Sequence, residues 1–353
     1  MSENTKIAWC DSTINFWEGC TKVSAGCANC YAETRDRHWH NGAHWGPSGI
    51  RRKSKSAVKD ALKMNRSPWI CDNCGRIAIQ TNGVLRTGMC VCQGTTKFHR
   101  RRIFSLSLGD WLEGPPRNVA KDGTPFGGIP VEWLAEMLDT IRRCPDVEWI
   151  LCTKRPEQFA KRMAKAGAFM QGNEQYDEAW RWCWDWVADV NDNPPSNITI
   201  LASVENQEQA DIRIPALLRI PAARRGLSLE PLLGPVVLPE QCNPANPGDP
   251  SSCCDPSRCF QCGIDWYILG GESGPKARPC NVDWIRSLVR QGKAAGLPVF
   301  VKQVGSNCVC TWESGTNHTR FPRTVDPKGA DMSEWPADLR VQEFPLDEGG
   351  GGS

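Results

Sequence analysis

The sequence predicts an α/β fold built as an incomplete β/α (TIM-like) barrel, with Cys-rich, metal-binding insertions. Short apolar runs alternate with longer amphipathic segments, and each run ends in polar or glycine residues. Alternating strands and helices indicate a parallel sheet, and near-continuous apolar strands fit a sheet buried on both faces. The expected strands are residues 102–108, 148–153, 198–204, 226–229, 265–269 and 298–302. The expected helices are residues 131–143, 156–166, 206–219 and 282–295.

The barrel-like core is expected to span residues 1–345, with three insertions. Residues 65–100 resemble a zinc ribbon, residues 171–195 carry a Trp-rich helix, and residues 239–263 are rich in Cys and Pro. Residues 346–353 end in a Gly/Ser stretch typical of a flexible tail or linker.

Composition narrows the class of protein. The 353 residues carry a net charge of +2, and no apolar run is long enough to cross a membrane. The first residues lack the pattern of a secretory signal, so we expect a cytoplasmic protein. In a reducing compartment, 19 Cys in groups indicate metal ligands rather than disulfides.

Residues suited to chemistry follow every predicted strand. In β/α barrels the site forms at the carboxyl ends of the strands, so these residues are expected to share one site. Each of them alone also fits the start of an ordinary polar loop. They are Gly109, Asp110, Lys154, Arg155, Glu205, Asn206, Glu230, Gly270, Gly271, Glu272 and Gln303.

The segment GCTKVSAGCANCY places Cys20, Cys27 and Cys30 on one loop. Three thiolates can bind three irons of a [4Fe-4S] cubane and leave the fourth iron open to a ligand that is not protein. S-adenosylmethionine can chelate such an iron and be cleaved there to a 5′-deoxyadenosyl radical. The alternative is a zinc site completed by Cys10 or His38.

These residues carry a resemblance to the radical S-adenosylmethionine superfamily, and more closely to a phage-encoded three-cysteine-motif family. The matching stretches are GCTKVSAGCANCYAE, FSLSLGDWL, WILCTKRPE, LSLEPLLGPV, WYILGGESGPKARP and PVFVKQVG. The superfamily's usual first gap is three residues, whereas here six residues separate Cys20 from Cys27. The resemblance implies a radical enzyme of a phage-infected bacterial host, served by a reductant of the flavodoxin or ferredoxin type.

The resemblance also implies cofactor contacts. Gly109 and Asp110 would contact the methionine moiety, and Ser203, Glu205 and Asn206 the ribose. The GGESG turn, which contains Gly270, Gly271 and Glu272, could bring backbone amides to a carboxylate or phosphate, or could be only a tight turn. Glu230 completes the expected cofactor-binding set, and no catalytic residue can be named.

The remaining cysteines predict further metal sites. Cys71, Cys74, Cys90 and Cys92 have the spacing of a zinc ribbon, although free thiols remain an alternative. A second group could hold a second zinc or, together with Cys308 and Cys310, an auxiliary Fe-S cluster. Its members are Cys242, Cys253, Cys254, Cys259 and Cys262. Small buried core residues are expected at Cys144, Cys152, Cys183 and Cys280.

Basic residues suggest a DNA or nucleotide partner. Arg100, Arg101 and Arg102 follow the ribbon and could contact phosphates, as could the basic run at residues 51–59, or both could be solvated faces. The family resemblance favours a modified base of phage DNA, such as a thymine bearing an amino-acid side chain. Two alternatives stay open: a non-catalytic, zinc-stabilised nucleic-acid-binding module, and a radical enzyme acting on a protein or small molecule.

Overall fold

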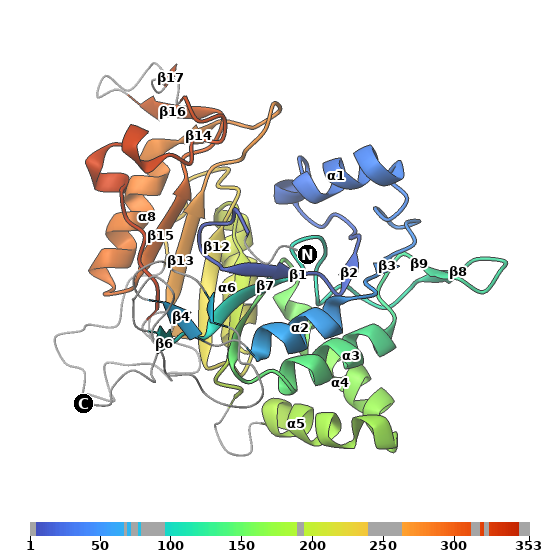
Figure 1. The fold of residues 1–353 in the computed structure, drawn as a ribbon. Helices are drawn as coiled ribbons and strands as arrows, with labels where there is room; N and C mark the ends of the chain where they lie inside the picture. Colours follow the sequence, from blue (N-terminus) through green and yellow to red (C-terminus); the bar gives the residue numbers. More distant parts are fainter. Residues whose placement is uncertain are drawn as a thin grey trace.

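A seven-stranded parallel sheet, curved into a half-barrel, forms the centre of the computed structural model (Figure 1). The structure describes residues 5–66, 69–71, 77–78, 96–188, 194–238, 263–311, 318–320 and 325–345. The strands lie in sequence order across the sheet, with β1 and β15 at its edges. Their bounds are β1 Ser12–Ile14, β7 Arg101–Ser105, β10 Val147–Thr153, β11 Ile198–Ser203, β12 Arg224–Leu229, β13 Trp266–Gly270 and β15 Val299–Gln303.

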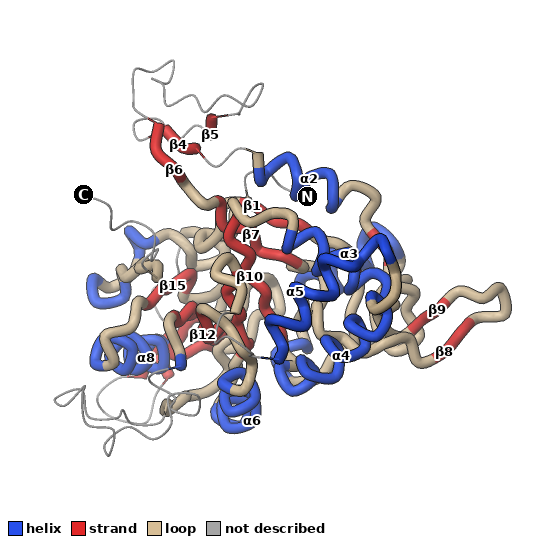
Figure 2. Tube along the Cα trace, turned by 90° about the horizontal axis from the view of Figure 1, so that it is seen from below, coloured by secondary structure: helices blue, strands red, loops and turns tan. Residues whose placement is uncertain are grey.

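Helices pack against the outer face of this sheet (Figure 2). Trp149 and Leu151 of β10 and Tyr267 of β13 share one buried cluster with helix residues such as Leu138 and Leu288. Each strand therefore presents alternate apolar side chains to the helix layer. The helices of the core are α2 Ala57–Asn65, α3 Val131–Arg142, α4 Phe159–Met170, α5 Asp177–Ala188, α6 Gln207–Leu218 and α8 Val282–Ala294.

A separate apolar cluster fills the inner face. Ile150 of β10, Leu201 of β11 and Trp266 of β13 pack there with Trp9, which precedes β1, and with Phe344 near the C-terminal end of the described chain. The segment around Phe344 also runs along β15: Val301 N–H donates to Val341 O at 2.8 Å, and Glu343 N–H donates to Val299 O at 2.9 Å. Segments from both ends of the chain thus complete the half-barrel.

The predicted α/β class and the order of strands and helices are confirmed, with boundaries that differ by a few residues. The sequence did not reveal β1, because three residues are too few to show a period. Of the expected insertions, the Trp-rich one contains α5, where Trp186 is 2% exposed and Trp184 is 60% exposed. Its four tryptophans therefore spread around the helix, as their alternating spacing predicted.

The ribbon-like insertion is described only in part. Strands β4 Trp69–Cys71, β5 Ile77–Ala78 and β6 Thr96–Phe98 form a small antiparallel sheet. Smaller pairings elsewhere join β2 Trp17–Glu18 to β3 Arg52–Lys53, β8 Asn118–Val119 to β9 Pro125–Phe126, and β16 Cys308–Thr311 to β14 Cys280–Asn281 and β17 His318–Arg320. Among the described residues, no helix is long and apolar enough to span a membrane.

The inner cluster should contribute strongly to stability. We expect Ile150→Ala, at a side chain with 0% exposure, to reduce the free energy of unfolding by about 3 kcal/mol, because it removes buried methyl groups and leaves a cavity. Ile212→Ala is the control, since Ile212 on α6 is 55% exposed and should change stability by less than about 0.5 kcal/mol. Urea unfolding followed by tryptophan fluorescence measures both, and equal effects would show that the inner face is not a core.

Candidate functional site

The loop that carries Cys20, Cys27 and Cys30 lies at the carboxyl edge of the parallel sheet. Gly19 N–H donates to Leu108 O at 3.0 Å, which joins the start of the loop to the turn after β7. The loop contains a short 3-10 helix, η1 Ala25–Cys27, and Cys30 directly precedes helix α1 Tyr31–His40. Charged side chains that follow four of the sheet strands hold this loop in place.

Arg155, after β10, connects the loop to the sheet. Its guanidinium donates to Asp110 Oδ2 at 2.8 Å and lies 3.5 Å and 3.6 Å from Cys20 Sγ through its two terminal nitrogens. It also donates to the carbonyl oxygen of Thr21. Asp110, after β7, additionally accepts from Thr153 Oγ1 and from the Lys154 amide. Asp110 is therefore committed to orienting Arg155 against the loop.

Glu205, after β11, binds the middle of the loop. Its carboxylate is fully buried, accepts from Gly26 N–H at 3.1 Å, and pairs with Arg213 of α6 at 2.7 Å. A Cβ at Gly26 would stand only 2.9 Å from the Glu205 carboxyl carbon, so the loop approaches this closely because residue 26 has no side chain.

Glu272, after β13, binds the last part of the loop. It accepts from Asn29 Nδ2 at 2.9 Å and from the Arg278 guanidinium at 2.6 Å. Arg278 in turn donates to the Ala25 carbonyl at 2.8 Å. The GGESG segment thus supplies a carboxylate clamp for the loop, in addition to a turn.

The thiols face cations. Burial raises the pKa of the Cys20 thiol to about 12, even though the adjacent Arg155 lowers it. Burial likewise raises the pKa of Cys30, against the opposing effect of Lys154. Such thiols are protonated at neutral pH and are poor nucleophiles, so a metal would have to displace their protons. These thiols are therefore not activated for covalent catalysis.

A polar layer lies on the inner face beneath the loop. Lys154 Nζ donates to Ser203 Oγ at 3.0 Å, and Cys152 Sγ lies 3.4 Å from the same oxygen. Burial lowers the pKa of Lys154, but Cys152, Cys27 and Glu205 outweigh this and raise it, so its ammonium stays charged. Among the described residues, no carboxylate lies within 4.0 Å of its nitrogen.

Glu230 belongs to the same layer. It pairs with Lys302 of β15 at 3.0 Å, and a Cβ at Gly270 would stand 2.6 Å from its carboxylate oxygen. Gly270 is thus required by the position of Glu230. The strand ends after β7, β10, β11, β12 and β13 are brought to one edge of the sheet, as the sequence predicted.

Two predicted cofactor contacts have other partners in the structure. The side chain of Asn206 accepts from Gln209 N–H at 3.0 Å and caps the N-terminus of α6. Gly109 packs against β2 and the start of the loop, since a Cβ there would stand 3.1 Å from Trp17 Nε1 and 3.3 Å from the Gly19 carbonyl oxygen. The roles of Asp110 and Glu205 are likewise to hold Arg155 and Gly26, so these residues position the loop.

The suggested fourth zinc ligands do not join the cysteines. Cys10 packs in the inner cluster before β1, whereas Cys20 lies beside Asp110, after the end of β7. His38 is exposed and contacts Trp39 on α1. The sulfur atoms of Cys20, Cys27 and Cys30 do not all lie within 4.8 Å of one another. Among the described residues, the ligand atoms of Asp36, His40 and His44 do.

Most of the other predicted cysteine ligands lie outside what the structure describes. This holds for Cys74, Cys90 and Cys92 and for Cys242, Cys253, Cys254, Cys259 and Cys262, while Cys71 is placed in β4 by its backbone alone. Cys308 is buried on β16, where it stands in register with Cys280 of β14. Cys144, Cys183 and Cys280 are buried core residues, as expected.

The expected basic patch is not a free surface. Arg101 is 7% exposed, and Arg102 pairs with Asp11 at 3.4 Å and lies 3.8 Å from the centre of the Phe344 ring. Arg100 is half-buried. The prediction of phosphate contacts at these residues is not supported, because β7 begins at Arg101 and draws the neighbouring side chains into the fold.

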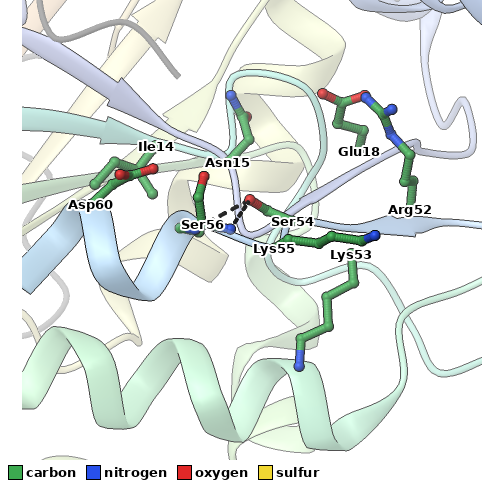
Figure 3. Close-up of a pocket in the computed structure, with 10 residues that line it drawn as sticks. Ile14, Asn15, Glu18, Arg52, Lys53, Ser54, Lys55, Ser56 and Asp60 are labelled. Carbon is green, nitrogen blue, oxygen red and sulfur yellow. Dashed lines mark hydrogen bonds and ion pairs between the residues drawn. The ribbon is translucent and has the colours of Figure 1, made fainter.

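The upstream basic run is also largely paired. It borders a hollow of about 300 Å³ near α2, drawn in Figure 3. Arg52 pairs with Glu18 at 2.5 Å and Lys53 with Glu136 at 2.6 Å, while Arg51 is buried against Glu113. The hollow lies at β1–β3 rather than under the cysteine loop, and its lining offers little unpaired positive charge.

Together, the fold and site define a parallel half-barrel protein whose carboxyl edge holds a clamped three-cysteine loop. The chain belongs to the family described as Protein of unknown function (DUF5131), whose model matches residues 4–332. No curated protein and no solved structure matches the chain.

Gly26→Ala should loosen the loop. The added methyl group would collide with the buried Glu205 carboxylate, and we expect a loss of about 1–3 kcal/mol in the free energy of unfolding and faster alkylation of Cys27. Gly114→Ala is the matched control, because a Cβ there meets nothing within 4 Å. Thermal unfolding and thiol labelling measure the two effects, and unchanged labelling in Gly26→Ala would contradict the close approach.

The carboxylate clamps should make stability depend on acid. Burial alone would raise the pKa values of Asp110 and Glu205, but Arg155 and Arg213 outweigh it and hold them below the ordinary 3.8 and 4.5. A depressed folded pKa stabilises the protein above the unfolded pKa, and this contribution is lost as pH falls below about 4.5.

Glu205→Gln should therefore lower stability by about 3 kcal/mol at pH 7 and flatten its decline between about pH 5 and 3. Glu208→Gln, at an exposed position on α6, should leave the profile unchanged. Thermal midpoints across this pH range test the pair, and parallel profiles for Glu205→Gln and the wild type would exclude the clamp.

Proposed function

We propose that this protein is a radical S-adenosylmethionine enzyme whose [4Fe-4S] cluster is bound by Cys20, Cys27 and Cys30. The observation that carries the proposal is the placement of these thiols on one clamped loop, at the edge of a parallel half-barrel where β/α proteins build their sites. The resemblance of the loop to that superfamily supports the same reading.

Charge around the loop fits an anionic cluster. Arg155 donates toward Cys20, and Lys154 and Arg278 act electrostatically on Cys27. A thiolate-bound iron-sulfur centre carries net negative charge, and hydrogen bonds to its sulfurs tune its potential. Cations at three points of the loop would stabilise that charge without occupying a ligand position.

The thiols do not have the close spacing of ligands bound to a single zinc ion. Zn–S bonds of about 2.3 Å hold tetrahedral thiolates within about 4 Å of one another, whereas a cubane binds each thiolate on a different iron. The thiols of this loop are not gathered to within 4.8 Å. A bound cluster would supply the electron that cleaves S-adenosylmethionine to a 5′-deoxyadenosyl radical.

The chain's own residues would bind and orient the cofactor. Lys154 presents an ammonium without a carboxylate partner, in the described part of the chain, to the space beneath the loop. It is suited to the carboxylate of S-adenosylmethionine. Ser203 and Glu230 offer oxygens in the same layer for its hydroxyl and amino groups.

The family resemblance alone supports a modified nucleobase of phage DNA as the substrate, with hydrogen abstraction followed by rearrangement. Electrons would come from a flavodoxin or ferredoxin type of reductant. Arg101 is buried and Arg102 is paired with Asp11, so the arginines at residues 100–102 add no support for a DNA contact at that place.

The cluster is tested first by composition. Protein purified anaerobically should be brown and contain iron and sulfide, and Cys20→Ala, Cys27→Ala or Cys30→Ala should each lose them, because each removes an iron ligand. Cys183→Ala, at a buried cysteine of α5, is the control and should keep its iron. A protein that stays free of iron after anaerobic reconstitution would refute the proposal and favour a zinc-stabilised module.

Chemistry is tested with the same variants. Reduced wild type with S-adenosylmethionine should release 5′-deoxyadenosine, detected by mass spectrometry, and the three loop variants should release none. Lys154→Met should keep its iron but bind S-adenosylmethionine at least about 10-fold more weakly, as expected for a lost charged hydrogen bond. A rise in product only with modified phage DNA would support the nucleobase; no product from a verified, reducible cluster would refute the radical mechanism.

A further inference from the structure

Three side chains of ligand type meet where helix α1 ends. Asp36, His40 and His44 offer one carboxylate and two imidazoles whose ligand atoms all lie within 4.8 Å of one another. Asp36 and His40 are four residues apart and so share one face of α1. The helix ends at His40, and Asn41 and Gly42 adopt φ angles of 51° and 75°, which turn the chain back and return His44 to Asp36.

The carboxylate of this group lacks an ordinary counter-ion. Asp36 is 3% exposed, and in the described part of the chain no Lys or Arg nitrogen lies within 4.0 Å of it. Its oxygens instead face His44, with Oδ1 2.5 Å from Nδ1 and Oδ2 accepting from the backbone N–H at 3.1 Å. A buried carboxylate is unfavourable without positive charge, and the C-terminal end of a helix also attracts cations.

The second histidine is not needed for a simple ion pair. His44 alone accounts for the side-chain contact with Asp36, yet the His40 ring also packs against His44, with the ring centroids 5.0 Å apart. Two imidazoles beside a carboxylate make a donor set for a transition metal.

The loop that carries His44 is held rigidly. Arg51 Nη1 donates to the carbonyls of His44, Gly46 and Gly49 at 2.8 Å, 3.0 Å and 3.1 Å. The backbone at His44 also packs closely against Gly19, because a Cβ at Gly19 would stand 2.3 Å from the His44 carbonyl oxygen. The ligands therefore come from a fixed backbone, which reduces the entropy lost on metal binding.

We propose that Asp36, His40 and His44 form a Zn²⁺ site with three protein ligands, completed by water. Zinc accepts nitrogen and carboxylate oxygen in tetrahedral geometry, and its divalent charge would neutralise Asp36. Both histidines are half-buried rather than fully enclosed, so solvent can supply the fourth ligand. The site is separate from the three-cysteine loop and does not depend on radical chemistry.

The zinc would support the cysteine loop through the backbone. Gly46 N–H donates to the Cys20 carbonyl at 2.9 Å, so the segment after His44 contacts the first cysteine directly. The first cysteine of the loop thus contacts Gly46, and the last one, Cys30, directly precedes α1. A metal that joins His44 to α1 therefore holds the loop at both of its ends. Its role would be structural.

Zinc content tests the site in the full-length protein. Anaerobically purified His40→Gln should hold one zinc per chain fewer than wild type by elemental analysis, whatever the Cys-rich insertions bind. His38→Gln, at an exposed position of the same helix, should hold as much as wild type. Equal zinc in His40→Gln and wild type would overturn the proposal.

Cobalt substitution adds a spectroscopic readout, and His44→Gln is a second variant that keeps the proposal testable if His40→Gln proves unstable. In protein produced with Co²⁺ in place of Zn²⁺, wild type minus His40→Gln should show visible d–d bands without the thiolate-to-cobalt charge-transfer bands that cysteine sites give. His44→Gln should give the same difference spectrum. A difference that contains thiolate bands, or no difference, would assign the metal elsewhere and refute the site. Normal iron in these variants separates this result from failure of the proposed cluster.

Discussion

The guanidinium of Arg155 is the contact on which the site depends. It joins the strand end after β10 to Asp110 after β7, and it reaches Cys20 and Thr21 of the loop. Because both charged partners are almost fully buried, removing either would leave an uncompensated charge. The sheet and the loop are thereby locked into one unit, and the other clamps at Glu205 and Glu272 act on a loop whose start is already fixed.

In this arrangement the acidic and basic residues at the strand ends hold the cysteine loop in position. Carboxylates that follow β7, β11 and β13 contact the loop directly or through an arginine, and each holds part of it. The groups left to meet a small molecule are then the ones on the inner face, above all Lys154 with Ser203. In the proposed enzyme, positioning of the loop and binding of a small molecule would be divided between two layers of residues that are neighbours in sequence.

The sequence was sufficient for the parts of the fold governed by local pattern. Residues 149–152 are all apolar because β10 is covered on both faces, and the helices carry apolar residues at helical spacing. The strand ends also had to meet, since parallel strands share one edge. The ion pairs of Arg213 with Glu205 and of Arg278 with Glu272 could not be predicted. The number of residues between the partners does not determine how far apart their side chains lie.

Other features were hidden for different physical reasons. Arg101 and Arg102 read as a surface patch, yet strand formation at β7 turned one inward and placed the other beside Asp11 and Phe344. The Asp36, His40 and His44 group is spaced at four residues, but only two of its members lie in one helix. His44 is brought to the other two residues by the left-handed turn at Asn41, and the sequence pattern did not predict this turn.

The segment around residues 341–343 covers the open edge of the half-barrel. An incomplete barrel has an edge strand at β15 whose unpaired amides and carbonyls could recruit a strand from another molecule. Val341 and Glu343 occupy those groups through Val301 and Val299, in an antiparallel pairing centred on Phe300 and Gln342. The last described stretch of chain therefore covers the edge strand β15, which an incomplete barrel would otherwise leave open to pairing with a strand of another molecule.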